Sequence, residues 1–301
     1  MLGMMAGDPE LDPPFDILLP TGAVSNVVLS SPHSGDVYPR SFLASARLDA
    51  QALRRSEDAY VDRLFQGGVL HGAPLLRARF PRAFLDVNRE PYELDPRMFD
   101  GRLPSFANTR SPRVAGGLGT IARVVGESQE IYARRLTVEE AIGRIDALYK
   151  PYHAQLRRLI EEAQHHFGAM LLIDCHSMPS SVVSSGPVGT HENRLRADVV
   201  LGDRYGTSCD RTVVDVAEAA LRGFGYHVDR NRPYAGGFIT EHYGHPATHR
   251  HALQIEINRH LYMDERSLRP NAHFPVLADH LAEMVAQLTS AMRGEQRMAA
   301  E

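Results

Sequence analysis

The chain has 301 residues, of which 43% are hydrophobic and 23% are charged, and its formal net charge at pH 7 is −4. This composition is that of a globular protein with a sizeable core, and no apolar run approaches the length that spans a bilayer. A negative balance argues against nucleic acid as the main partner. We therefore expect a globular protein that acts on neither nucleic acid nor membrane.

Residues 1–16 lack the basic segment and the apolar stretch of a secretion signal. The two cysteines, Cys175 and Cys209, are too few for a disulfide framework, so we expect a cytoplasmic protein. Arginine supplies 32 of the 33 basic residues, and Lys150 is the only lysine. An anion-binding side chain here is therefore expected to be an arginine, which can bind a carboxylate through two parallel hydrogen bonds.

Short aliphatic runs, typical of buried strands, alternate with longer stretches whose apolar residues have helical spacing. In the longest helical stretch, Thr137 and Glu140 form a capping-box pattern, Pro151 predicts a kink or two abutting helices, and Gly168 ends the helix. In chain order we predict a strand at 26–31, a helix at 45–68, a strand at 73–80, a helix at 137–168, strands at 169–175 and 197–203, a helix at 212–224, a strand at 252–258 and a helix at 274–293.

Strands that alternate with helices predict an α/β fold with a mostly parallel sheet. Residues 96–118 are rich in Pro, Gly and Arg and have no apolar period, so a long loop that is functional or disordered is expected there. The sequence contains no internal repeat and no obvious linker. We therefore expect a single domain over residues 1–301, in which residues 1–20 are peripheral.

A histidine lies just past the end of two of the predicted strands. His33 lies in "PHSGD" after the first strand, and His176 lies in "IDCHS" after the strand at 169–175. Ligands of open α/β sheets gather beyond the C-terminal ends of the strands. A single histidine at such a place is more often a packed polar residue than a ligand, so the pair is a hypothesis that needs further residues.

A carboxylate that could join them lies in "SEDAYVD", where Asp58 and Asp62 are four residues apart and share one face of the predicted helix. Two histidines and one carboxylate, with an open fourth position, form a recurrent ligand set for catalytic zinc. A metal held in this way can polarise a carbonyl or acidify a water. Because these residues are far apart in sequence, their spacing alone does not prove a site.

Other polar residues are candidates for roles beside a metal. Glu256 stands in an apolar strand, where a carboxylate is costly unless it is functional or paired with a cation such as Arg259. Asn88 and Arg89 follow a short apolar stretch and could bind a substrate carboxylate, although an isolated surface arginine is the usual alternative.

The segment "TEHYGHPATHRH" is the main rival metal site. It contains four histidines, but Pro246 prevents the first two from sharing a regular helix with the last two, and we rank it below the strand-end pair. Just before it, Gly236 and Gly237 permit a backbone turn close to a ligand. The four histidines are His242, His245, His249 and His251.

Taken together, these motifs resemble the N-formylglutamate amidohydrolase family. They occur in the family's order and extend over about residues 27 to 262. They are "SSPHSGDVYP", "EDAYVDRLF", "RAFLDVNREPYELDPRMF", "GLGTIARVV", "IDCHSMP", "LGDRYGTSC", "PYAGGFITEHYG" and "LQIEINRHLY".

The resemblance implies a three-layer α/β fold, with helices on both faces of a mostly parallel mixed sheet, similar to the zinc carboxypeptidases and succinylglutamate desuccinylases. It implies a Zn²⁺-dependent amide hydrolase that splits the small molecule N-formyl-L-glutamate into formate and L-glutamate, a step of histidine degradation. Related N-acyl amino acids, or a non-catalytic binding role on the same scaffold, are the alternatives. Whether the protein forms a homo-oligomer is left open.

The resemblance also implies roles for individual residues. Three of them would be metal ligands, with Glu57 and Asp36 as alternatives to the acidic ligand Asp58. One carboxylate would be the general base, one arginine would stabilise the oxyanion or a second carboxylate, and four residues would bind substrate. The ligands are His33, Asp58 and His176, the base is Glu256, the arginine is Arg123, and the substrate-binding residues are Asn88, Arg89, Gly237 and His242.

Overall fold

The computed structural model describes residues 8–126, 128–181 and 197–299. The chain divides into two compact units, each built from three separate segments. The first unit contains Met1–Asp16, Pro32–Ala59 and Arg77–Arg157, and the second contains Ile17–Ser31, Tyr60–Leu76 and Arg158–Glu301.

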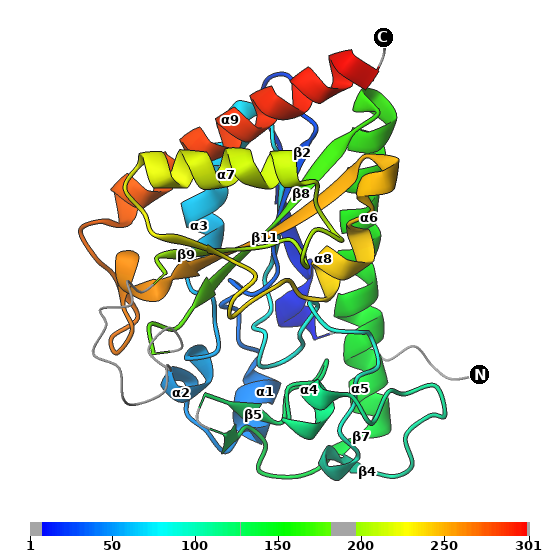
Figure 1. Ribbon diagram of the computed structural model, residues 1–301. Helices are drawn as coiled ribbons and strands as arrows, with labels where there is room; N and C mark the ends of the chain where they lie inside the picture. Colours follow the sequence, from blue (N-terminus) through cyan, green and yellow to red (C-terminus); the bar gives the residue numbers. More distant parts are fainter. Residues whose placement is uncertain (1–7, 127, 182–196, 300–301) are drawn as a thin grey trace, which may run out of the picture. The chain divides into compact units, whose positions relative to one another are not determined.

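The main sheet has seven strands in the order β1-β3-β2-β8-β11-β9-β10. Its strands β2, β8, β11 and β9 are labelled in Figure 1. The central strands β2, β8 and β11 are parallel, β9 runs antiparallel to β11, and β10 runs parallel to β9. The mixed α/β sheet predicted from the sequence is thus confirmed. The strands are β1 (Phe15–Leu18), β2 (Val27–Ser31), β3 (Leu75–Ala78), β8 (Met170–Met178), β9 (Val199–Gly202), β10 (Val228–Arg230) and β11 (Arg250–Asn258).

Helices cover both faces of the central strands. Leu29 of β2 and Val285 of α9 both lie against Gly68, whereas Gln254 of β11 contacts Gly237 at the start of α8. Leu29 pairs with Ile173 of β8 and Gln254 pairs with Asp174, the next residue of the same strand. Neighbouring residues of a strand point to opposite faces, so α9 and α8 lie on opposite faces of the sheet. The other elements of the second unit are α3 (Val61–Phe65), η2 (Gln66–His71), α7 (Arg211–Gly223), α8 (Phe238–Tyr243), η6 (Pro246–Thr248), η7 (Arg259–Leu261), β12 (Met263–Asp264), β13 (Arg269–Pro270) and α9 (Phe274–Ala299).

The first unit is built from short elements around an aromatic cluster. The guanidinium of Arg144 lies 3.9 Å from the centroid of the Phe84 ring and donates hydrogen bonds to the Phe84 carbonyl and the Tyr132 hydroxyl. The elements are η1 (Pro9–Leu11), α1 (Arg40–Ser45), α2 (Ala50–Arg54), η3 (Pro96–Met98), β4 (Phe99–Asp100), α4 (Pro112–Ala115), β5 (Val124–Val125), β6 (Gln129–Glu130), β7 (Leu136–Thr137), α5 (Val138–Arg144), the π-helical segment η4 (Ile145–Tyr149) and α6 (Lys150–Phe167), which continues into the second unit.

Most of the predicted elements are confirmed, including all five strands and the helices now seen as α7 and α9. Thr137 and Glu140 form the expected capping box, and Gly168 ends α6 with φ of 71°. The stretch with Pro151 consists of abutting helices joined through η4, and Pro151 lies two residues after this π-helical segment. Residues 96–118 contain η3, β4 and α4, and residues 15–18 form the edge strand β1.

The helix predicted over residues 45–68 is wrong. Two short helices, α2 and α3, occupy this stretch and are followed by η2. Tyr60 interrupts the helical pattern because its φ is 65°, in the left-handed region. Asp58 therefore lies in the non-helical stretch between α2 and α3, and it does not share the helical face with Asp62 that the spacing predicts.

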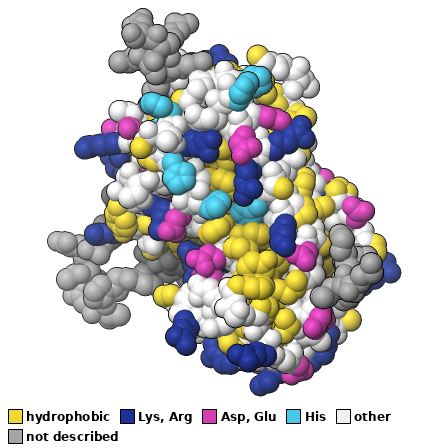
Figure 2. Space-filling model, turned by 90° about the vertical axis from the view of Figure 1, so that its right-hand side faces the viewer, with side chains coloured by type: hydrophobic (Ala, Val, Ile, Leu, Met, Phe, Trp, Pro, Cys, Tyr) yellow, Lys and Arg dark blue, Asp and Glu magenta, His cyan; other side chains and the backbone are white. Residues whose placement is uncertain are grey.

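No helix within residues 8–126, 128–181 and 197–299 is long and apolar enough to cross a membrane. Figure 2 shows one face of the protein, on which basic and acidic side chains are interspersed and hydrophobic side chains gather in the lower half of the view.

We expect Gly35→Ala, in the turn after β2, to lower the free energy of unfolding by about 1–3 kcal/mol. A Cβ at this position would lie 2.2 Å from the Phe80 carbonyl oxygen, so the backbone of the turn would have to shift. Gly22→Ala is the matched control, because no atom lies within 4 Å of its added Cβ. Urea unfolding curves of both variants check the prediction, and equal midpoints for the two would contradict it.

Candidate metal centre

His33 lies two residues after β2 and is 1% exposed. Its Nε2 is 2.7 Å from Asp86 Oδ1, and its carbonyl oxygen accepts a hydrogen bond from the Asp58 backbone N–H at 3.0 Å. These contacts fix both the imidazole ring and the turn that carries it.

Asp86 stays ionised despite its burial. Burial alone would raise the pKa of its carboxyl group, but Arg89, His33 and Arg82 hold that pKa well below its ordinary value. Oδ2 lies 3.0 Å from Arg82 and 3.7 Å from Arg89, and Oδ1 also accepts the backbone N–H of Asn88 at 2.8 Å. Because an ionised carboxylate only accepts hydrogen bonds, the His33 proton belongs on Nε2, and Nδ1 carries the lone pair that a metal requires.

His176 repeats this arrangement on the neighbouring strand. Its Nε2 lies 2.9 Å from Asp174 Oδ2, and the two residues occupy the same face of β8 because they are two positions apart. The sequence placed His176 just after a strand. The structure places it inside β8, which extends to Met178. In both histidines, therefore, Nε2 is the nitrogen that lies against a buried aspartate, Asp86 for His33 and Asp174 for His176.

Asp58 brings the third candidate ligand. Its Oδ2 lies 3.4 Å from His33 Nδ1, and its side chain is 1% exposed. Of the two alternatives to it, Glu57 accepts hydrogen bonds from the Tyr38 hydroxyl at 2.6 Å and from Arg54 Nε at 3.0 Å, and Asp36 is exposed. The geometry therefore favours Asp58 over both.

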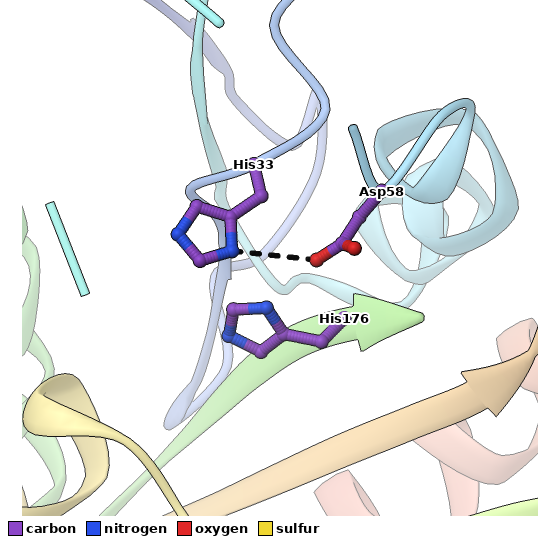
Figure 3. Close-up of side chains that lie close together, drawn as sticks. All are labelled: His33, Asp58 and His176. Atoms are coloured by element: carbon purple, nitrogen blue, oxygen red, sulfur yellow. Dashed lines mark ion pairs between the residues drawn. The ribbon is translucent and has the colours of Figure 1, made fainter. Parts of the chain in front are cut away.

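One ligand atom from each of His33, Asp58 and His176 lies within 4.8 Å of the others, and all three residues are buried (Figure 3). Two imidazoles and one carboxylate suit a divalent transition metal. Asp86 and Asp174 lie against the two imidazoles in the way that carboxylates lie against metal-binding histidines in known sites.

The rival histidine segment does not assemble into a comparable group. Within the part of the chain that the structure describes, the three residues above form the only cluster with metal-ligand geometry. His251 lies in β11, where its Nδ1 accepts the Asp210 backbone N–H at 3.2 Å. His242, His245 and His249 are exposed. The His242 ring stacks on Phe238 with 5.0 Å between centroids.

Glu256 lies beside His176, since the two are register partners on the parallel strands β11 and β8 and therefore point to the same face of the sheet. Its side chain is held by Gln254, whose Nε2 donates to Glu256 Oε1 at 2.9 Å. Gln254 Oε1 in turn accepts the backbone N–H of Gly237 at 2.7 Å. The Gly237 N–H is thus engaged inside the protein, where it orients the residue that holds Glu256.

The predicted arginines lie in different surroundings. Arg89 contacts Asp86, the partner of His33, and donates from Nε to the Leu118 carbonyl and from Nη1 to the Asn88 carbonyl. Arg123 instead donates to Asp95 at 3.0 Å and lies 3.5 Å from Glu130.

Sequence reasoning missed four residues that support the centre. All four lie inside the motifs quoted above. Three of them precede a predicted site residue by two positions, and the fourth, Arg82, precedes Asp86 by four. On a strand, a polar residue two positions before a candidate site residue lies on the same face, and this signal could have identified Asp174 and Gln254. The four residues are Arg82, Asp86, Asp174 and Gln254.

We expect Asp174→Asn to weaken metal binding by roughly 10- to 100-fold, because the imidazole of His176 loses a charged partner that raises its basicity. Titration of the metal-free protein with Zn²⁺ against a competing chelator measures the affinity. Asp198→Asn is the control, because its carboxylate lies 3.7 Å from His260 and outside the metal-ligand cluster. Unchanged affinity in Asp174→Asn would show that this carboxylate does not support the site.

Residues 25–263 match the sequence profile of the N-formylglutamate amidohydrolase family. An N-formylglutamate deformylase of Pseudomonas aeruginosa is 29% identical over 269 residues, which cover 88% of the chain and 92% of that protein. An N-formylglutamate deformylase of Pseudomonas putida is 26% identical over the same length, with 88% and 91% covered.

Solved structures give a concordant result. The crystal structure of an N-formylglutamate amidohydrolase from Ralstonia eutropha JMP134 superimposes with a TM-score of 0.87 at 38% identity, covering 94% of the chain and 99% of that protein. A protein from Agrobacterium tumefaciens, at 20% identity and a TM-score of 0.64, shares the fold over 92% of the chain.

Proposed function

Because the chain belongs to the N-formylglutamate amidohydrolase family, we propose that it hydrolyses N-formyl-L-glutamate to formate and L-glutamate with the help of Zn²⁺. The observation that carries the proposal is the buried group of His33, Asp58 and His176, next to the carboxylate of Glu256. The alternative acidic ligands, Glu57 and Asp36, have the less suitable surroundings described above.

Zn²⁺ held by these three residues would supply a Lewis acid that polarises the formyl carbonyl and lowers the pKa of a water. Glu256 would accept a proton from the attacking water and pass it to the nitrogen of the departing glutamate. The oxygen of the water then ends in formate. Gln254 supports this role because its amide holds Glu256 Oε1 in a fixed place.

A formyl group is small, so most of the recognition energy has to come from the two carboxylates of glutamate. Asn88 and Arg89 are proposed to bind one of them, since Arg89 lies against the Asp86 carboxylate that orients His33. The catalytic role of Arg123 and the substrate contacts of Gly237 and His242 stay predictions, as do the cytoplasmic location and the oligomeric state.

The proposed substrate is tested by turnover of a panel of N-formyl, N-acetyl and N-succinyl amino acids. We expect N-formylglutamate to have the highest kcat/KM, with formate and glutamate released in equal amounts. Faster turnover of N-formylaspartate or N-succinylglutamate would replace the substrate but keep the hydrolase. No turnover of any member would point to a binding protein on the same scaffold.

We expect Glu256→Gln to lower kcat by about 10²- to 10⁴-fold, since an amide cannot take up the proton of the attacking water. The zinc content of the variant should equal that of the wild type, because Glu256 is not among the ligands. Steady-state kinetics and elemental analysis check both parts. Full activity of the variant would remove Glu256 from the mechanism.

We expect Arg89→Lys to raise KM about tenfold or more and to change kcat little, because lysine keeps the charge but loses the two parallel hydrogen bonds to a carboxylate. Arg82→Lys is the matched control, since Arg82 is the other guanidinium on Asp86. An equal rise of KM in both variants would show that the effect passes through Asp86 and not through a contact of Arg89 with substrate.

A further inference from the structure

A pocket of about 240 Å³ in the first unit is lined by five arginines and by one carboxylate, that of Glu130. None of the three candidate metal ligands lines it. The arginines come from the segment after α1, from η3 and from the chain around β5, β6 and β7. They are Arg47, Arg97, Arg123, Arg134 and Arg135.

Two of these arginines are held in place by a buried carboxylate beneath them. Asp95, which is 2% exposed, accepts Arg97 Nε at 2.9 Å and Arg97 Nη2 at 2.7 Å, and its Oδ2 also accepts Arg123 Nε at 3.0 Å. One edge of each guanidinium is thus fixed against Asp95. Rigid guanidinium groups lose less conformational entropy when they bind an anion than mobile side chains do.

Glu130 is a weak counter-ion for this group. Its Oε2 lies 3.5 Å from Arg47 Nη1 and its Oε1 lies 3.5 Å from Arg123 Nη1, whereas strong N–H···O⁻ contacts measure about 2.7–2.9 Å. Its side chain is half-exposed, and it belongs to the two-residue strand β6. A carboxylate held so loosely can be displaced by a better anion.

The remaining charges leave the pocket positive. Arg134 is bound by Glu140 at 2.7 Å, but Arg135 lies 3.9 Å from Asp100 in a pair that is largely exposed. Five guanidinium groups therefore face only four carboxylates, of which Asp95 and Glu140 hold their partners in tight hydrogen bonds and the other two do not.

We propose that this pocket is a binding site for a small dianion, such as inorganic phosphate or a short dicarboxylate. The anion binds between Arg47 and Arg123, where Glu130 now lies, and Arg97 adds a third cation from the Asp95 side. The pocket contains none of the three metal-group residues, and it shares with the predicted hydrolytic residues only Arg123.

Isothermal titration of the full-length protein, with inorganic phosphate and separately with glutarate, tests the site. Arg47→Gln should weaken binding about fivefold, which is the scale of an exposed ion pair. Glu130→Gln should tighten binding by a similar factor, because it removes the internal competitor. Both side chains are at least half-exposed, so neither change threatens the fold. Affinity should also fall as NaCl is raised.

Arg158→Gln and Glu162→Gln are matched controls, since these residues form an exposed ion pair on α6 and should leave anion affinity unchanged. Binding of phosphate alone supports a phosphate site, and binding of glutarate alone supports a dicarboxylate site. Binding of neither anion overturns the proposal. So does an affinity that is equal in the wild type, Arg47→Gln and Glu130→Gln, which would place any bound anion elsewhere, for example on a metal ion.

Discussion

At 2.7 Å, the hydrogen bond between His33 Nε2 and Asp86 Oδ1 decides which nitrogen of this imidazole is left for a metal. The contact of His176 Nε2 with Asp174 Oδ2, at 2.9 Å, has the same effect on β8. Without these carboxylates each ring could adopt either tautomer or turn over, and no fixed pair of donor nitrogens would face Asp58. The buried acid–imidazole pairs are therefore the constraint on which the site and its chemistry depend.

The parallel register of β8 and β11 extends this constraint from the ligands to the proposed base. Asp174 and His176 lie next to Gln254 and Glu256, on one face of two strands about 4.8 Å apart. A strand presents alternate residues to one face, so in a polar pair at positions i and i+2 one side chain can orient the other. On β8 Asp174 orients His176, and on β11 Gln254 orients Glu256.

The sequence predicted what local pattern controls and missed what depends on tertiary contacts. The apolar runs located the central strands, and the histidines after them located two of the three residues in the metal-ligand cluster. The left-handed backbone of Tyr60, which interrupts the predicted helix near Asp58, could not be predicted from the local sequence, because a tyrosine rarely adopts that conformation. Asp86 was missed because its partner is 53 residues away, and the family resemblance, not the spacing, selected Asp58.

The central claim is that His33, Asp58 and His176 hold one divalent metal ion. An anomalous-difference map from crystals of the zinc-loaded protein, recorded on both sides of the zinc absorption edge, tests it most directly. The account predicts one strong peak about 2.0–2.2 Å from Nδ1 of each histidine and from the Asp58 carboxylate. A map with no peak at these three residues, or with its main peak among the histidines of residues 242–251, would contradict it.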